Sequence, residues 1–275
     1  MHRAFLLNND SGGKVEQINE IKQPLISVIT PAYNSEKFIK ETIESVQSQT
    51  YSNWEMIIVD DCSTDKTAEI VTSYQEHDTR IIFIQLEENS GSAVARNTAM
   101  EAAQGRFIAF LDSDDMWLPE KLEKQLQFML TKQVAFSFTE YARVNEEGTD
   151  INAVMKAPAS IDYTGLMKHC VIGCLTVMLD TEKTGKVRMI NIRSRQDYVL
   201  WLTLTKNGFL AYGLPEVLSK YRIVQDSISS NKIKMVKRNW SVYRVVEEQS
   251  VVKSAWYIFN YAFHYIKRRF NRKNK

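Results

Sequence analysis

Four short runs of apolar and β-branched residues constrain the fold of this chain more than any other feature of its sequence. The runs are Leu25–Thr30, Met56–Val59, Ile81–Leu86 and Phe107–Leu111. Each is apolar at successive positions, which is typical of strands buried on both faces of a parallel sheet. Segments with apolar residues at helical spacing alternate with them: Glu36–Gln49, Thr64–Tyr74, Gly91–Gln104 and Pro119–Leu130. This alternation predicts the α/β class, with a doubly wound, mostly parallel central sheet flanked by helices.

The second half of the chain gives weaker signals. A fifth strand is expected at Val134–Tyr141, and the periodicity then fades through Glu146–Ser160. A helix is expected at Arg195–Lys206, followed by two strand-like runs at Phe209–Tyr212 and Val217–Arg222. From about Ile233 the spacing of apolar residues predicts a long C-terminal helical extension.

Charge is distributed unevenly along the chain. The total is nearly neutral, with 35 Lys and Arg against 33 Asp and Glu, but residues 231–275 carry 12 basic and 2 acidic side chains. The preceding part is therefore acidic, which argues against a dedicated nucleic-acid-binding protein. The cysteines Cys62, Cys170 and Cys174 are too few for a disulfide framework and lack the partners of a zinc site, so a reduced, cytoplasmic protein is expected.

Acidic residues follow two of the predicted strands, at the sheet edge where α/β proteins bind ligands. The stretch Asp112-Ser113-Asp114-Asp115 places three carboxylates within four residues, and their mutual repulsion favours a bound Mg²⁺ or Mn²⁺. The alternative is that Asp114 or Asp115 only caps the next helix. Asp60-Asp61 has the same ambiguity, since a carboxylate there can cap a helix or accept a hydrogen bond from the imide of uracil.

No phosphate-binding lysine motif or dinucleotide fingerprint follows the first strand. Tyr33 can offer its ring face to a base. The segment Asn89-Ser90-Gly91-Ser92, with Arg96 one turn later, can cradle phosphates at a helix N-terminus or can be an ordinary loop.

Four ordered motifs together resemble family 2 glycosyltransferases of GT-A fold. They are Thr30–Ser35, Val59–Asp65, Asn89–Ala99 and Phe110–Asp115. The resemblance extends over about residues 24–230 and is strongest over 24–141. Within the family, the chain is similar to members that build bacterial cell-surface polysaccharides such as teichuronic acid. One departure is Cys62, where the family usually has glycine.

The resemblance implies a UDP-sugar donor and a divalent cation, Mn²⁺ or Mg²⁺. Asp114 would hold the metal with Asp112 or Asp115. The nucleotide-sugar would contact Thr30, Pro31, Tyr33, Asp60, Asp61, Arg96, Asp112, Ser113 and, less firmly, Arg222. Asp197 would be the base of an inverting transfer to a glycan or lipid-linked acceptor, and Gln196 replaces the more common glutamate beside it.

The same resemblance divides the chain into an N-terminal extension (1–23), a GT-A domain (24–230) and a basic helical segment (231–275). Within the domain, 24–141 would bind the nucleotide-sugar and 142–230 would supply the acceptor side and the base. Ser254–Ile266 is rich in aromatic residues, and six basic residues follow in Lys267–Lys275. This pattern indicates either an anionic membrane surface bound through 254–275, at the inner face of the cell membrane, or a final helix packed on the core.

Two other functions remain open from sequence alone. A sugar-phosphate nucleotidyltransferase also uses a nucleotide-binding sheet and a carboxylate-bound metal, but a basic, glycine-rich loop would follow its first strand. A nucleotide-binding, non-catalytic subunit of a membrane polysaccharide-assembly complex would be favoured if Asp197 lay far from the sugar site.

Overall fold

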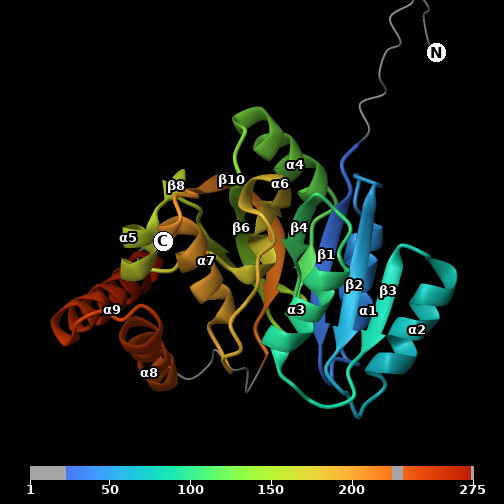
Figure 1. The fold of residues 1–275 in the computed structure, drawn as a ribbon, viewed down its shortest axis with the longest axis horizontal. Helices are drawn as coiled ribbons and strands as arrows, with labels where there is room; N and C mark the ends of the chain where they lie inside the picture. The colour runs from blue at the N-terminus through green and yellow to red at the C-terminus, as the bar shows by residue number, and fades with distance from the viewer. Residues whose placement is uncertain (1–22, 225–231, 274–275) are drawn as a thin grey trace, which may run out of the picture.

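The computed structural model describes residues 23–224 and 232–273, so almost all of the predicted extension 1–23 lies outside the described residues. Figure 1 shows a central sheet with helices on both faces and two further helices at the end of the molecule farthest from β3.

The strands are β1 (Ile26–Ala32), β2 (Trp54–Asp60), β3 (Ile81–Gln85), β4 (Phe107–Phe110), β5 (Met116–Trp117), β6 (Phe136–Val144), β7 (Asp150–Met155), β8 (Ser160–Ile161), β9 (Met178–Asp180) and β10 (Ala211–Arg222). The helices are α1 (Ile39–Gln47), α2 (Thr67–His77), α3 (Ser92–Ala102), α4 (Lys121–Lys132), α5 (Tyr163–Lys168), α6 (Thr181–Thr184), α7 (Gln196–Lys206), α8 (Lys232–Ser241) and α9 (Val251–Lys273). A 3₁₀ turn at Cys174–Thr176 and a π-helical turn at Val242–Val246 complete the elements.

The sheet confirms the predicted α/β class and has the order β3-β2-β1-β4-β9-β6-β10-β5, with β7 on β6 and β8 on β10. Strands β3, β2, β1 and β4 are parallel. β1, β2 and β4 are buried throughout, as predicted, whereas β3 lies at the edge of the sheet and is only partly buried. The short strand β9 then pairs antiparallel with both β4 and β6, while β10 runs parallel to β6. The parallel arrangement therefore holds in the first half, and the second half is mixed.

Two apolar cores lie on opposite faces of the sheet. Alternate residues of β1 separate between them, because Val28 faces one core and Ile29 the other. Helices α1, α2 and α4 contribute to the first core, and α3, α5 and α7 to the second. Since every strand from β1 to β4 runs in the same direction, their carboxyl ends meet along one edge.

Two differences from the sequence-based prediction have clear causes. The second run, Val217–Arg222, and the last two residues of the first, Ala211 and Tyr212, belong to one strand, β10. The pairing of β10 with β6 shifts register between Leu214 and Val217 around a proline. The C-terminal helical stretch is divided into α8, the π-helical turn and α9, with a break at 247–250. Ser250 begins α9, where its hydroxyl accepts a hydrogen bond from the backbone N–H of Lys253.

Candidate active site

The loop after β1 is tied to the loop after β4. Thr30 and Pro31 are buried in β1, and Tyr33 beyond the strand is 50% exposed, so its ring face is accessible. Ser35 bonds the hydroxyl of Ser113 at 2.7 Å. The structure thus brings the predicted base-stacking residue and the acidic loop to the same edge.

The first acidic pair, Asp60 and Asp61, accepts hydrogen bonds from other groups of the protein. Asp60 is fully buried and accepts hydrogen bonds from Ser63 and from the Gln85 amide. The two carboxylate oxygens of Asp61 accept the backbone N–H groups of Ser90 and Gly91, at 2.7 and 2.8 Å. Asp61 therefore holds the loop that leads into α3, and a hydrogen bond from a uracil imide to Asp61 stays a prediction.

The residue after this pair, Cys62, has a backbone φ of 63°. Residues other than glycine rarely adopt this left-handed backbone conformation, because their Cβ atom crowds the backbone. The departure noted in the sequence, cysteine in place of the family's usual glycine, therefore falls at a position where glycine would be less strained.

The second acidic stretch is less completely satisfied. Asp112 pairs with the Arg96 guanidinium, while Asp115 is 1% exposed and its Oδ2 has no hydrogen-bond partner. Burial, reinforced by the charge of Asp112, raises the pKa of Asp114 to about 6. Burial and the charge of Asp114 raise the pKa of Asp115 as well. These carboxylates are held together in a loop that lacks enough positive charge to balance them.

The donor set fits a hard divalent cation shared with a phosphate-bearing ligand. Among the residues that the structure describes, no group of three or more His, Cys, Asp or Glu side chains is arranged to hold a metal by itself. Mg²⁺ and its relatives usually take one or two carboxylates and complete their coordination with water and substrate phosphates. The buried, unpartnered Oδ2 of Asp115 and the raised pKa of Asp114 are consistent with such a partial set.

A fully buried arginine fixes this loop from behind. The backbone N–H of Arg222 donates to Asp115 Oδ1 at 2.9 Å, and its Nε donates to the carbonyl of Asp114 at 2.9 Å. Its other guanidinium nitrogens donate to the carbonyl of Glu146 and to the carboxylate of Glu41. The Arg222 guanidinium is therefore engaged by the protein, and a contact with the diphosphate stays a prediction.

Helix α1 holds the same loop from its other side. The hydroxyl of Thr42 donates to the carbonyls of Ser113 and Asp115, at 3.0 and 2.8 Å. Thr42 therefore holds the loop through backbone carbonyls, whereas Arg222 holds both the Asp114 carbonyl and Asp115 Oδ1. Asp115 Oδ2 is left without a hydrogen-bond partner.

The predicted base lies in the first turn of α7, which contacts α3. Asp197 is half-buried, and the residue before α7, Arg195, has a left-handed φ of 71°. The amide of Gln196 donates to the hydroxyl of Ser92 at 2.6 Å. This bond joins the beginning of α7 to the beginning of α3, the helix that carries Arg96.

Arg96 on α3 lies between the acidic loop after β4 and helix α7, which carries Asp197. Burial acts to lower its pKa, but the charges of Asp112, Cys174 and Asp197 raise it overall. Burial also raises the pKa of the Cys174 thiol, and Asp112 and Asp197 act in the same direction. Arg96 is thus paired with Asp112, and Asp197 acts on the pKa of both Arg96 and Cys174.

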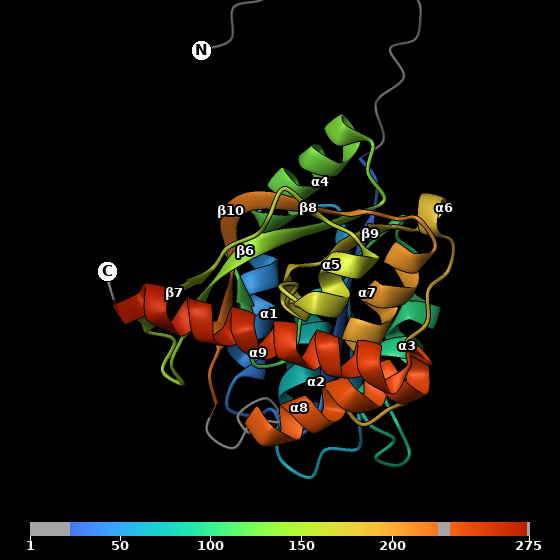
Figure 2. The same ribbon diagram turned by 90° about the vertical axis from the view of Figure 1, so that its left-hand side faces the viewer.

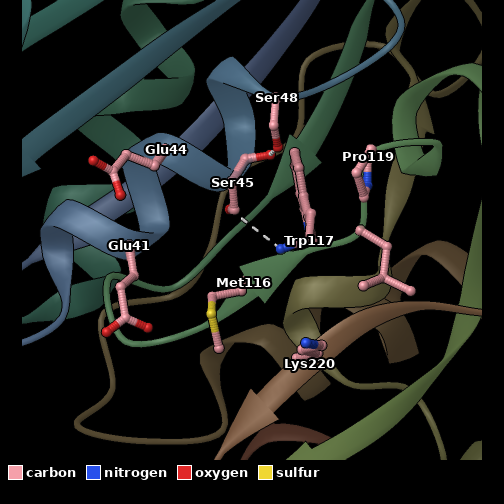
Figure 3. A pocket seen from close by; sticks show the side chains of 9 residues that line it. Glu41, Glu44, Ser45, Ser48, Met116, Trp117, Pro119 and Lys220 are labelled. Atoms are coloured by element: carbon pink, nitrogen blue, oxygen red, sulfur yellow. Dashed lines mark hydrogen bonds between the residues drawn. The ribbon is translucent and has the colours of Figure 1, made fainter. Parts of the chain in front are cut away.

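A pocket of about 350 Å³ lies next to this site, between α1 and β5 (Figure 3). Glu41, Ser45, Trp117 and Lys220 are among the residues that line it, and the Trp117 backbone N–H donates to the Ser45 hydroxyl at 3.2 Å. None of the predicted site residues lines this pocket. It adjoins the loop through Glu41, the partner of Arg222.

Several contributors to the site were not predicted from the sequence. Glu41 and Thr42 lie on α1, which carries no motif, and Cys174 was considered for a disulfide or a zinc site. Ser92 belongs to the motif Asn89–Ala99, but its contact with Gln196 was not predicted. The one available signal was the position of Ser92 in the Asn89–Ser92 loop.

Comparison with known proteins identifies the family. Residues 27–189 match the glycosyl transferase family 2. The "Putative teichuronic acid biosynthesis glycosyltransferase TuaG" of Bacillus subtilis is 52% identical over 90% of this chain and 98% of its own length. The "UDP-Glc:alpha-D-GlcNAc-diphosphoundecaprenol beta-1,3-glucosyltransferase WfgD" of Escherichia coli is 42% identical over 91% of this chain and 97% of its own.

Solved structures agree with this assignment. S. aureus TarS 1-349 in complex with UDP-GlcNAc matches with a TM-score of 0.66 and 25% identity over 80% of this chain and 65% of that one. The mannosyltransferase PcManGT from Pyrobaculum calidifontis, in complex with GDP-Man and Mn²⁺, has a TM-score of 0.65 over 86% of this chain and 70% of its own; at 18% identity it supports the fold alone. This chain is an enzyme, a glycosyltransferase, and belongs to glycosyl transferase family 2.

Proposed function

We propose that the protein is a metal-dependent, inverting glycosyltransferase that moves a sugar from a UDP-sugar to a hydroxyl of a lipid-linked glycan acceptor. The role proposed is bacterial surface polysaccharide synthesis. The names of two relatives support it, since one is a putative teichuronic acid biosynthesis enzyme and the other transfers glucose from UDP-Glc to a diphosphoundecaprenol-linked sugar. Solved complexes of TarS with UDP and with UDP-GlcNAc support the class of donor.

The nucleotide-sugar would bind across the carboxyl ends of β1, β2 and β4, within residues 24–141. Tyr33 would stack on the base, Asp60 and Asp61 would hold the uracil side, and Asp112 with Ser113 would contact the ribose and diphosphate. Residues 142–230 would form the acceptor side and carry the base. This division remains a proposal.

Asp114, with Asp112 or Asp115, would hold Mn²⁺ or Mg²⁺. When bound, the cation neutralises the charge that develops on the leaving diphosphate. The protein's part is to present the carboxylates at a fixed position, and Arg222 and Thr42 do so through the loop backbone.

Asp197 would accept the proton of the acceptor hydroxyl as its oxygen attacks the anomeric carbon. The observation that carries this proposal is the Gln196–Ser92 hydrogen bond, which joins the first turn of α7 to the beginning of α3, the helix of Arg96. Asp197 also acts to raise the pKa of Arg96. An inverting transfer needs one base and no covalent sugar–enzyme intermediate, which agrees with a single candidate carboxylate on the α7 side.

The alternative functions have less support. Family membership and the absence of a basic glycine-rich loop after β1 argue against nucleotidyl transfer to a sugar phosphate. A non-catalytic subunit would be favoured if Asp197 lay far from the sugar site. The Gln196–Ser92 hydrogen bond argues against this, because it holds the beginning of α7 against α3, the helix of Arg96.

We also propose that transfer takes place at the inner face of an anionic membrane, because the acceptor of one relative is attached to a lipid. No helix in the described part of the chain is long and apolar enough to cross a bilayer. Contact with the membrane would therefore be peripheral.

The test is UDP release from a panel of UDP-sugars with Mn²⁺ or Mg²⁺, using wild type and Asp197→Asn. We expect at least a hundredfold loss of transfer in the variant, because it keeps the shape of the side chain and loses the base. Donor affinity, measured by calorimetry, should stay within about threefold of wild type. Retained turnover in Asp197→Asn would remove that residue from the mechanism, and no release from any UDP-sugar would contradict the proposed donor.

A further inference from the structure

The C-terminal helices expose an unusual amount of apolar surface. On α9, Val252, Trp256, Phe259 and Phe263 are 79%, 55%, 63% and 53% exposed. Their spacing of four, three and four residues places them on one face of the helix, and we name these four residues the α9 stripe. Val245 (71%), Val251 (57%) and Trp240 (37%) extend the exposed apolar surface toward α8. Contiguous surface of this kind on a folded protein indicates a binding face.

The opposite face of α9 is anchored on the protein. Ser254 is fully buried, and the ring of Tyr257 packs against that of Tyr243 with centroids 5.5 Å apart. Tyr257 and Ile258 pack against the core that contains α5 and α7. Because this inner face is fixed, the α9 stripe faces away from the core.

The charge of the sequence segment that contains the stripe is almost entirely positive. Residues 231–275 contain 12 basic and 2 acidic side chains. Of the two acids, Glu247 is buried and paired with Lys206, so Glu248 is the exposed one. Aromatic residues beside a high density of Lys and Arg match the interface of an anionic bilayer, where rings lie at headgroup level and cations pair with lipid phosphates.

We propose that the α9 stripe is the membrane-docking surface of this enzyme and inserts into the headgroup region of an anionic bilayer. The inferred surface begins at Val252, before the sequence segment 254–275. Figure 2 shows α9 crossing the face of the molecule in front of α5 and α7. Docking there would place the helix that carries Asp197 on the membrane side of the sheet.

This inference rests on the proposed function only for the lipid-linked acceptor; binding to vesicles can be measured without it. The experiment is flotation of the full chain with phosphatidylglycerol–phosphatidylcholine vesicles and with phosphatidylcholine alone. The test variant is Trp256→Ser/Phe259→Ser/Phe263→Ser. The matched control, Ile151→Ser/Val154→Ser/Ile190→Ser, removes three exposed apolar side chains outside the C-terminal helices, which are 43%, 41% and 38% exposed in the wild type.

Wild type and control should float with anionic vesicles and less well in about 0.5 M NaCl, since screening weakens the charge pairing. The test variant should lose at least tenfold in bound fraction while binding UDP as wild type does, which shows that it is folded. Equal flotation of the test variant and wild type, or no binding of wild type to anionic vesicles, would overturn the proposal. A wild-type dimer in solution that the test variant abolishes would assign the stripe to a second copy instead. UDP release on a soluble acceptor separates these results from a failure of the proposed function.

Discussion

Two acidic stretches lie at the same edge of the sheet, but they differ in how many hydrogen-bond donors the protein supplies to their carboxylates. After β2, Asp60 and Asp61 are surrounded by donors, and both oxygens of Asp61 accept backbone N–H groups. After β4, Asp114 and Asp115 have few donors to their side chains, and one buried oxygen of Asp115 has none. The protein stabilises the first pair itself, whereas the second retains an excess of negative charge.

This contrast separates the carboxylates that the protein satisfies by its own hydrogen bonds from those that it leaves open to a further partner. A satisfied carboxylate is costly to remove, because buried N–H groups lose their acceptor. An unsatisfied carboxylate costs little stability to neutralise, and its removal can even relieve repulsion. Sequence alone gives both stretches the same appearance, since each offers adjacent aspartates before a helix.

The largest effect should come from the second stretch. Asp114→Asn should lower kcat/KM for the UDP-sugar by at least about a hundredfold, because a carboxylate ligand to the cation is lost. Its thermal unfolding temperature should equal or exceed that of wild type when no metal is present. Initial-rate kinetics and calorimetric scans measure both, and a strongly destabilised Asp114→Asn would refute the assignment of that carboxylate to a ligand.

Asp61→Asn should behave in the opposite manner. The neutral amide accepts more weakly and presents an N–H₂ group to Ser90 and Gly91, so we expect a loss of about 1–3 kcal/mol in the free energy of unfolding. Urea denaturation measures this loss, with Asp150→Asn on the exposed edge strand β7 as the control. Unchanged stability in Asp61→Asn would show that the two stretches do not differ as described.

The pH dependence of stability should also separate the two stretches. The pKa of Asp114 is raised from its ordinary 3.8 to about 6, mainly by burial, so the metal-free folded protein holds a proton that the unfolded chain releases. The stabilisation from this proton is complete below about pH 4 and is lost as the pH rises through 6. Relative to Asp114→Asn, wild type should therefore lose stability between pH 4 and 7 without metal. A difference between the two proteins that is constant with pH would contradict the raised pKa.

The smallest effect is expected beside the first stretch. Cys62→Gly should change stability by no more than about 1 kcal/mol, toward greater stability, because glycine relieves the left-handed strain but gains freedom in the unfolded chain. Cys62→Ala retains the strain and is the matched control. A Cys62→Gly protein less stable than Cys62→Ala would mean that strain at this φ is not significant.

The elements that could be predicted are those with a local pattern. The four buried runs gave β1 to β4, and the acids after β2 and β4 gave the binding edge, because both depend on neighbouring residues. β10 was read as two strands, since a proline at a register shift has the appearance of a break.

The contacts that complete the site join residues far apart in the chain. Arg222 and Glu41 are 181 positions apart, and Gln196 and Ser92 are 104 apart. Helix α1 carries no pattern that marks Glu41, and the motif that includes Ser92 does not indicate Gln196 as its partner. Only the folded sheet, which brings α1, β10 and the β4 loop together, makes Arg222 a support of the acidic loop.

The most direct test of this account is a calorimetric titration of UDP into wild type, Asp114→Ala and Asp61→Asn, each with and without Mn²⁺. Wild type should bind UDP at least about tenfold more tightly with Mn²⁺, because the cation joins the loop after β4 to the diphosphate. Asp114→Ala should lose this gain, while Asp61→Asn should keep it even if its affinity is lower overall. Superimposable wild-type titrations with and without Mn²⁺ would contradict the central claim that the carboxylates after β4 bind a cation.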